Sequence, residues 1–148
     1  MVLMALDYGS KTVGVAVSDA LGIAAHPLET IIREHENKLR RTLARIEEIV
    51  LERGVEKIIL GKPLHMDSSE GERVKKTEDF KLLLEKRLGK EIIYIDERLT
   101  SAEAKELLSE SGIKAGEMKK YIDSVAAALM LKEYMAAESR GRENDERQ

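Results

Sequence analysis

Four acidic residues have the types and positions that metal-dependent chemistry requires. One follows an apolar run at residues 2–6, two follow another at 91–95, and one lies in a segment with helical periodicity: Asp7, Asp96, Glu97 and Asp123. A charged carboxylate at the end of a buried strand needs a cation, a metal ion or backbone N–H groups as its partner. Oxygen-only ligation suits Mg²⁺ or Mn²⁺. A pair of such ions activates water and stabilises the leaving oxygen in phosphodiester cleavage.

Each acid also has a local interpretation that involves no metal. Asp7 opens a Gly-Ser turn and can accept hydrogen bonds from the backbone of that turn. Asp123 can form a surface ion pair with Lys119, one helical turn earlier. Asp96 can cap the next helix, and Glu97 can pair with its neighbour Arg98. The metal interpretation therefore depends on whether folding brings the acids together.

Apolar periodicity predicts the elements that would position these acids. Strands are expected at 2–6, 13–17, 21–32, 55–60 and 91–95, and the turn at 9–12 makes the first two a β-hairpin. Helices are expected at 37–53, from the end of a polar loop at 67–71 to Gly89, from 100 or 101 to 111, and at 117–137. Pro27 places the third strand at an edge or a bulge. We therefore predict an α/β fold with a mixed five-stranded sheet, an antiparallel hairpin meander followed by β-α-β units, and helices on both faces.

In such a sheet the carboxyl ends of the strands gather ligands, which favours Asp7 and the 96–97 pair as neighbours. The last helix is predicted to bury one stripe, formed by Met118, Ile122, Val125 and Leu129. At about 100° per residue, Asp123 lies at the border of that stripe, where it can reach over a strand end. The alanines at 126–128 are small enough to let this helix lie close on the sheet.

Length and composition narrow the classes of protein. The 148 residues suit one domain, expected at 1–138, followed by a polar, disordered tail at 139–148. The absence of cysteine excludes a disulfide framework and a thiolate zinc site. A net charge of −3 argues against a polycation that coats nucleic acid, and 3% aromatic residues argue against stacking platforms for single strands. The adjacent Arg40 and Arg41 are interpreted as a solvated helix face.

Neither a membrane-spanning run nor a signal-type N-terminal segment is recognisable in the sequence. We therefore expect a cytoplasmic protein with no membrane partner, present as a monomer or a weak homodimer.

Five motifs in order along residues 3–137 resemble the YqgF (RuvX) family: Asp7-Tyr-Gly-Ser-Lys-Thr-Val-Gly-Val-Ala-Val-Ser-Asp19, Pro27-Leu-Glu-Thr30, Met66-Asp-Ser-Ser-Glu-Gly71, Asp96-Glu-Arg-Leu-Thr100 and Asp123-Ser-Val-Ala-Ala-Ala128. That family is described as Holliday junction resolvases and as pre-16S ribosomal RNA nucleases. The resemblance implies a ribonuclease H-like fold, nuclease chemistry with two Mg²⁺ or Mn²⁺ ions, and a cytoplasmic role in ribosome biogenesis. Carried over by motif, the catalytic and metal-binding acids are Asp7, Glu97 and Asp123, with Asp96 as the alternative to Glu97.

The chain departs from many ribonuclease H-like enzymes at the end of the strand at 55–60. Those enzymes carry a catalytic acid there, whereas this chain has Gly61-Lys62, so the second acid has to come from Asp96 or Glu97. The family usually has an apolar residue at the position of Lys62. Phosphate binding beside an acidic cluster needs nearby cations, and the predicted substrate contacts are Lys11, Lys62 and Arg98.

We predict a metal-dependent endonuclease that hydrolyses structured nucleic acid, with the 5′ end of precursor 16S rRNA as the preferred substrate. Holliday junction resolution on DNA is the alternative. Two other classes stay open: a nucleic-acid-binding module with a vestigial site, and half of an actin-like or sugar-kinase-like ATP-binding protein. The phosphate loop of the latter also begins Asp-x-Gly-[Ser/Thr], but those proteins close two such domains over the nucleotide.

Overall fold

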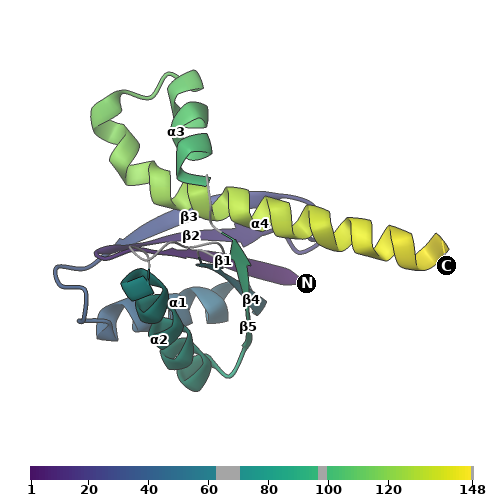
Figure 1. Ribbon diagram of the computed structural model, residues 1–148, viewed down its shortest axis with the longest axis horizontal. Coiled ribbons are helices and arrows are strands. Elements are labelled where there is room, and N and C mark those ends of the chain that lie inside the picture. The colour runs from purple at the N-terminus through teal and green to yellow at the C-terminus, as the bar shows by residue number, and fades with distance from the viewer. Residues whose placement is uncertain (63–70, 97–99, 148) are drawn as a thin grey trace.

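A single five-stranded sheet forms the centre of the computed structural model, which describes residues 1–62, 71–96 and 100–147 (Figure 1). The strands are β1 (Val2–Tyr8), β2 (Thr12–Ser18), β3 (Ala25–Ile32), β4 (Val55–Lys62) and β5 (Glu91–Asp96). Their order across the sheet is β3-β2-β1-β4-β5. The β1–β2 and β2–β3 pairs are antiparallel, and the β1–β4 and β4–β5 pairs are parallel. The predicted mixed sheet is confirmed, and Pro27 lies in an edge strand beside a register shift.

The helices are α1 (Arg40–Arg53), α2 (Gly71–Leu88), α3 (Thr100–Glu110) and α4 (Ala115–Arg147). Helices α1 and α2 cover one face of the sheet, α4 crosses the other face, and α3 packs against α4 (Figure 1). Helix α1 begins three residues later than the apolar pattern indicates, with Leu39 as its N-cap. It ends where Gly54 adopts a left-handed conformation, with a φ of 63°.

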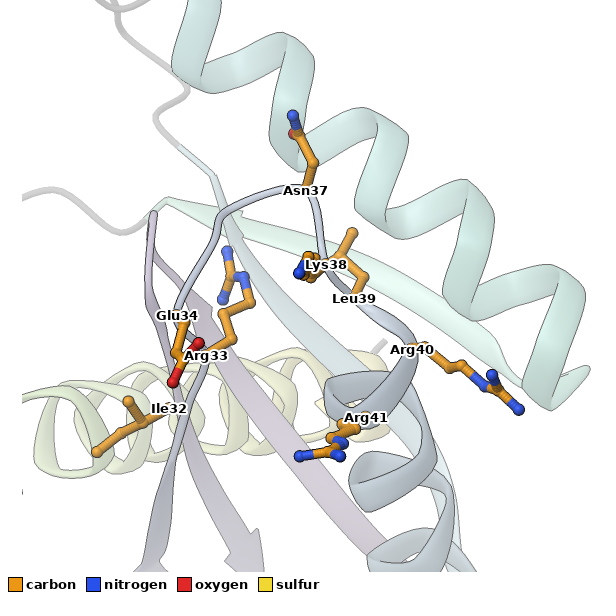
Figure 2. A pocket seen from close by; sticks show the side chains of 8 residues that line it. All are labelled: Ile32, Arg33, Glu34, Asn37, Lys38, Leu39, Arg40 and Arg41. Atoms are coloured by element: carbon orange, nitrogen blue, oxygen red, sulfur yellow. The ribbon is translucent and has the colours of Figure 1, made fainter.

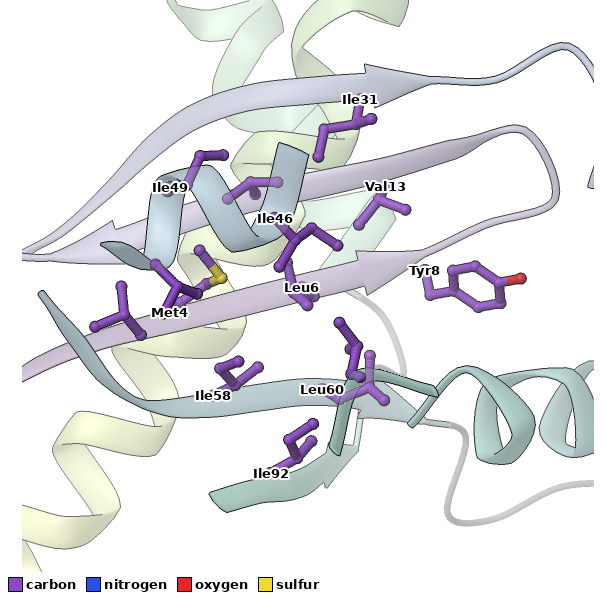
Figure 3. Packing of buried hydrophobic residues seen from close by; sticks show 14 of the residues in the cluster. Met4, Leu6, Tyr8, Val13, Ile31, Ile46, Ile49, Ile58, Leu60 and Ile92 are labelled. Atoms are coloured by element: carbon purple, nitrogen blue, oxygen red, sulfur yellow. The ribbon is translucent and has the colours of Figure 1, made fainter. Parts of the chain in front are cut away.

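Side chains of the central strands alternate between two apolar cores. On the α1 and α2 side, Met4, Leu6 and Tyr8 of β1 pack with residues of β4 and the two helices (Figure 3). On the α4 side, Leu3 and Ala5 of β1 belong to a smaller core with residues of α4. Successive residues of a strand point to opposite faces of the sheet. The two cores therefore show to which face each side chain of β1 points.

The buried face of α4 differs from the predicted stripe. Met118, Ile122, Val125 and Leu129 are only half-buried, whereas the most deeply buried apolar residues are Ala126, Ala127, Ala128, Met130 and Leu131. Close contact between helix and sheet favours small side chains at the contact, so the alanines are more buried than the larger residues beside them. The predicted apolar stripe consisted of larger residues that lie to the side of this contact.

Residues 139–147, the segment expected to be a polar tail, continue α4 as far as Arg147. The arginine and glutamate residues of this segment have high helix propensity, and a helix that is already nucleated extends at little cost. Polar composition alone is therefore a poor sign of disorder when a docked helix precedes it. None of the helices in the described ranges is long and apolar enough to cross a membrane.

Candidate active site

Asp7 lies near the end of β1 with its side chain on the α4 face of the sheet. Leu3 and Ala5 contact α4, whereas Tyr8 lies in the opposite core. Asp7 has the parity of Leu3 and Ala5, so its half-buried carboxylate points to the same side as theirs. Its partner in the antiparallel ladder is Gly14 of β2.

Helix α4 passes directly over Gly14 at Asp123. A Cβ atom at position 14 would overlap the backbone carbonyl of Asp123, so this close approach requires glycine. Thr12, on the same face of β2, donates a hydrogen bond of 2.7 Å from its hydroxyl to Oδ2 of Asp123. Since directly opposed residues of two strands point to one face, Asp7 and Asp123 lie on the same face of the sheet and meet at Gly14. The structure therefore brings together two of the predicted acids.

The third predicted acid falls in a segment outside the described residues, which include neither Glu97 nor Arg98. Asp96 is the last residue of β5 and pairs in register with Lys62 of β4. It has the parity of Ile92 and Tyr94, which lie in the core under α1 and α2, so alternation directs Asp96 away from the face of Asp7.

The two described cations among the predicted substrate contacts lie in different surroundings. Lys11 is exposed in the turn between β1 and β2, directly after the strand that carries Asp7. Lys62 places its Nζ 4.3 Å from the centroid of the Tyr94 ring and 3.8 Å from Oε1 of Glu78 in α2. Lys62 thus lies on the opposite face of the sheet from Asp7 and Asp123.

The polar atoms near Gly14 are the carboxylate oxygens of Asp7 and Asp123 and the hydroxyl oxygen of Thr12. Mg²⁺ and Mn²⁺ prefer oxygen ligands of this kind. Within residues 1–62, 71–96 and 100–147, no three His, Cys, Asp or Glu side chains are arranged to hold a metal ion. The carboxylates of Asp7 and Asp123 fit this ligand chemistry, and the further acid expected from the sequence, Glu97, lies outside the described residues.

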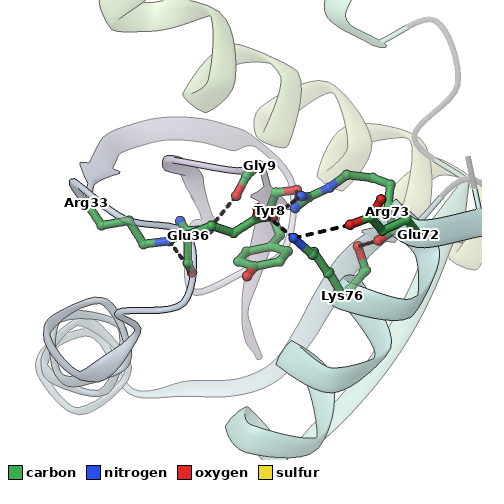
Figure 4. Close-up of polar contacts among 8 residues, drawn as sticks. Tyr8, Gly9, Arg33, Glu36, Glu72, Arg73 and Lys76 are labelled. Atoms are coloured by element: carbon green, nitrogen blue, oxygen red, sulfur yellow. Dashed lines mark hydrogen bonds and ion pairs between the residues drawn. The ribbon is translucent and has the colours of Figure 1, made fainter.

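A layer of arginine side chains supports the turn that follows Asp7, and we did not single it out from the sequence. The guanidinium carbons of Arg33 and Arg73 lie 4.8 and 4.9 Å from the centroid of the Tyr8 ring, which also stacks on Phe80 at 4.0 Å. Arg73 donates to the carbonyl of Tyr8 at 3.1 Å, and Arg33 donates to the carbonyl of Gly9 at 2.6 Å (Figure 4). The two carbonyls just after Asp7 are therefore held by guanidinium groups.

Glu36 connects this layer to α2. Its carboxylate accepts a hydrogen bond of 2.6 Å from Arg73 and one of 2.8 Å from Lys76 (Figure 4). Hydrogen bonding from Lys76, followed by that from Arg73, lowers the pKa of Glu36 below its ordinary value, against the opposing effect of burial. Alternation could have revealed Arg33, since it follows buried Ile31 by two residues, whereas no local pattern marks Arg73.

Two of the solved structures that resemble this fold over nearly the whole chain are resolvases. RuvC of Thermus thermophilus in complex with a Holliday junction matches with a TM-score of 0.58 and 17% identity, over 94% of this chain and 96% of that chain. The fowlpox virus resolvase in complex with Holliday junction DNA matches with a TM-score of 0.56 and 13% identity, over 93% and 98%. The chain therefore has the ribonuclease H-like fold that these two resolvases share.

Closer relatives are found by sequence. A protein of Lachnospira eligens named "Putative pre-16S rRNA nuclease" is 49% identical over 140 residues, covering 95% of this chain and 100% of its own length. A protein of the same name from Lactococcus lactis is 42% identical, over 91% of this chain and 94% of its own length. The family described as "RuvX: Holliday junction resolvase" matches residues 1–137, and the chain belongs to this family of nucleases.

Proposed function

We propose that this protein is a metal-dependent endonuclease that hydrolyses phosphodiester bonds in precursor 16S rRNA. The observation that carries the proposal is the meeting of Asp7 and Asp123 at Gly14, on one face of the sheet. The name of the relatives from Lachnospira eligens and Lactococcus lactis supports the choice of RNA as the substrate.

The residues that would hold Mg²⁺ or Mn²⁺ are Asp7, Asp123 and Glu97. When two such ions are bound, they supply activation of a water molecule and stabilisation of the leaving oxygen. We choose Glu97 over Asp96 because alternation along β5 directs Asp96 toward the α2 side, away from Asp7.

The chain's own groups orient these acids. The Thr12 hydroxyl holds one oxygen of Asp123, which restricts the rotation of that carboxylate. The Arg33 and Arg73 contacts to the carbonyls of residues 8 and 9 hold the backbone just after Asp7. Carboxylates held in position in this way need little reorganisation when metal and substrate bind.

Lys11 and Arg98 are proposed to contact substrate phosphates, because they adjoin Asp7 and Glu97 in the sequence. We assign Lys62 a structural role instead of a substrate contact, because its ammonium group packs over the Tyr94 ring and near Glu78.

One cleavage assay tests the function. Purified protein with Mg²⁺ or Mn²⁺ is given precursor 16S rRNA, a four-way DNA junction and ATP in parallel. We expect cleavage of the RNA and loss of activity by at least about a hundredfold in Asp7→Asn, because removing a ligand charge weakens both metal binding and water activation. Asp79→Asn, on the exposed side of α2, is the matched control and should cut as the wild type does.

Each other outcome of this assay has a definite meaning. The family description and the RuvC-like fold favour junction cleavage as the second candidate, and cutting of the DNA junction alone would establish it. Turnover of ATP without cleavage of either nucleic acid would contradict the nuclease proposal. Undiminished cutting by Asp7→Asn would show that Asp7 is not a metal ligand or that a contaminant cuts.

A further inference from the structure

A basic groove lies at the bend that joins β3 to α1. Its volume is about 720 Å³, and four cations and one carboxylate are among its lining residues: Arg33, Lys38, Arg40, Arg41 and Glu34. Figure 2 shows these side chains arranged around the bend, with the Arg33 guanidinium inside it. The chain as a whole has a net charge of −3, so this excess of positive charge is local. Such a groove selects an anionic ligand.

Arg33 contributes a buried hydrogen-bond donor to this groove. The residue is only 7% exposed, its Nε donates to the carbonyl of Glu36 at 3.1 Å, and its Nη2 donates to the carbonyl of Gly9 at 2.6 Å. Its Nη1 is buried and makes no hydrogen bond of standard geometry in the part of the chain that the structure describes, although the Tyr8 side chain interacts with the guanidinium group. Buried guanidinium N–H groups are normally satisfied, so an unsatisfied one on a groove wall points to an acceptor supplied by a ligand.

The start of α1 provides a second, independent feature in the same groove. No side chain makes a capping hydrogen bond at Leu39, and no acidic residue occurs in the first turn. The backbone N–H groups of a first helical turn carry the positive end of the helix dipole and bind anions. Arg40 and Arg41, both exposed, add two full charges at this point. An uncapped helix start and an unsatisfied buried guanidinium both select an anion such as phosphate.

Backbone and side-chain hydrogen bonds connect this groove to the candidate active site. The Arg33 backbone N–H donates to the carbonyl of Lys11 at 2.8 Å, and its side chain donates to Gly9. Both acceptors belong to the turn that follows Asp7. The groove therefore lies at the same end of the sheet as Asp7 and Lys11.

We infer that the groove at the start of α1 binds a backbone phosphate of the nucleic-acid substrate, away from the bond that is cut. This inference rests on the proposed nuclease function. It assigns a binding role to the adjacent Arg40 and Arg41, which the sequence pattern left as a solvated helix face. Phosphate contacts of this kind position a substrate without reading its sequence.

The first experiment measures nucleic-acid binding by the full chain. Affinity for fluorescent precursor rRNA is measured in EDTA at several salt concentrations, for the wild type, Arg40→Glu/Arg41→Glu and Lys86→Glu/Lys90→Glu. The second double variant makes the same charge change at exposed sites at the end of α2 and just before β5. We expect the first to lose about tenfold or more in affinity and about 1 unit of salt slope, as for one lost phosphate contact. The control should bind nearly as the wild type does.

The second experiment probes the phosphate site directly. Inorganic phosphate is titrated into ¹⁵N-labelled protein, and saturable shifts are expected at the amides of Arg40, Arg41 and Thr42 and at the Arg33 Nε–H. The shifts should persist in Lys86→Glu/Lys90→Glu and disappear in Arg40→Glu/Arg41→Glu. Matching spectra elsewhere in the chain show that each variant is folded.

The outcomes separate this inference from the function it rests on. If the wild type cuts RNA but both double variants bind it equally, the groove inference alone is overturned. Phosphate shifts without any effect on RNA affinity would make the groove a site for small anions and would also overturn it. If the wild type neither cuts nor binds nucleic acid, the proposed function and this inference fall together.

Discussion

The hydroxyl of Thr12 is the described side chain that holds Asp123, through a hydrogen bond that joins residues 111 positions apart. Hydrogen bonds to charged groups are stronger than those between neutral groups, and they fix the direction of the carboxylate. Thr12 is therefore a positioning residue, which acts on the reaction through Asp123.

Thr12→Val removes this hydrogen bond and keeps the shape of the side chain. We expect a loss of about 1–2 kcal/mol in the free energy of unfolding. We also expect a fall in kcat that exceeds any change in KM. Urea unfolding and steady-state cleavage measure the two effects. Thr12→Ser, which retains the hydroxyl, should recover kcat, and equal kcat in the valine variant and the wild type would show that the bond has no effect on the reaction.

At the scale of single residues, the sequence indicated the types of the site residues better than their directions. Asp7 was recognisable because a carboxylate ends an apolar run. Lys62 lies just as close to a strand end, yet its side chain packs on the other face over Tyr94. The face to which a side chain of β4 points depends on its position in the alternation along the strand. Both faces of β4 are buried, so its apolar run is continuous and the sequence shows no alternation.

At the scale of elements, the contact between α4 and β2 decides whether Asp123 can approach Asp7. Gly14 leaves no room for a Cβ atom beneath the Asp123 carbonyl, so the distance from helix to sheet is set by a missing side chain. No local sequence rule reports such a contact, because the two residues belong to elements at opposite ends of the chain.

Gly14→Ala tests this contact. The added methyl group would force α4 away from the sheet, at a cost of about 1–3 kcal/mol in the free energy of unfolding. Cleavage should fall as well, because Asp123 moves with the helix. Thermal unfolding and the cleavage assay measure both losses. Gly116→Ala is the matched control in the first turn of α4, where nothing lies within 4 Å of the added Cβ and stability should hold or rise.

The order of strands and helices was predictable because each element has its own periodicity and stop signal. The continuation of α4 to Arg147 was not predictable. The composition of residues 139–147 resembles that of a disordered tail, and composition does not show that a helix precedes the segment. The face that α4 buries was also missed, because alanines at a close contact carry little hydrophobic signal.

At the scale of the whole molecule, charge is separated into distinct regions. The acids meet on the α4 face, while the cations of the groove lie at the bend before α1. Between the bend and α2, Glu36 accepts hydrogen bonds from Arg73 and Lys76 and so joins two parts of the molecule that are distant in sequence.

The stability of the molecule should depend on pH through Glu36. Its pKa in the folded protein is lowered from the ordinary 4.5, chiefly by the hydrogen bond from Lys76, so its ionised form stabilises the fold. That contribution is complete above the unfolded pKa and is lost as pH falls through the folded pKa.

Glu36→Gln should therefore lower the free energy of unfolding by about 1 kcal/mol at pH 7, with allowance for partial exposure. The difference from the wild type should shrink as the pH falls through the lowered pKa of Glu36, where the side chain becomes protonated. Denaturant unfolding at a series of pH values measures this, with Glu52→Gln on the exposed side of α1 as the control. A difference that stays constant across the pH range would contradict an ionic contribution from Glu36.

The bond between Thr12 and Asp123 also has a consequence in time. A ribosome makes β1 and β2 early and the start of α4 only after all five strands have been synthesised. A nascent chain therefore carries Asp7 long before it carries its partner acid. Until α4 emerges and docks over Gly14, the growing polypeptide lacks one of the proposed metal ligands. An unfinished copy would be unable to cut the RNA around it, and the activity would begin only when the last helix closes the structure.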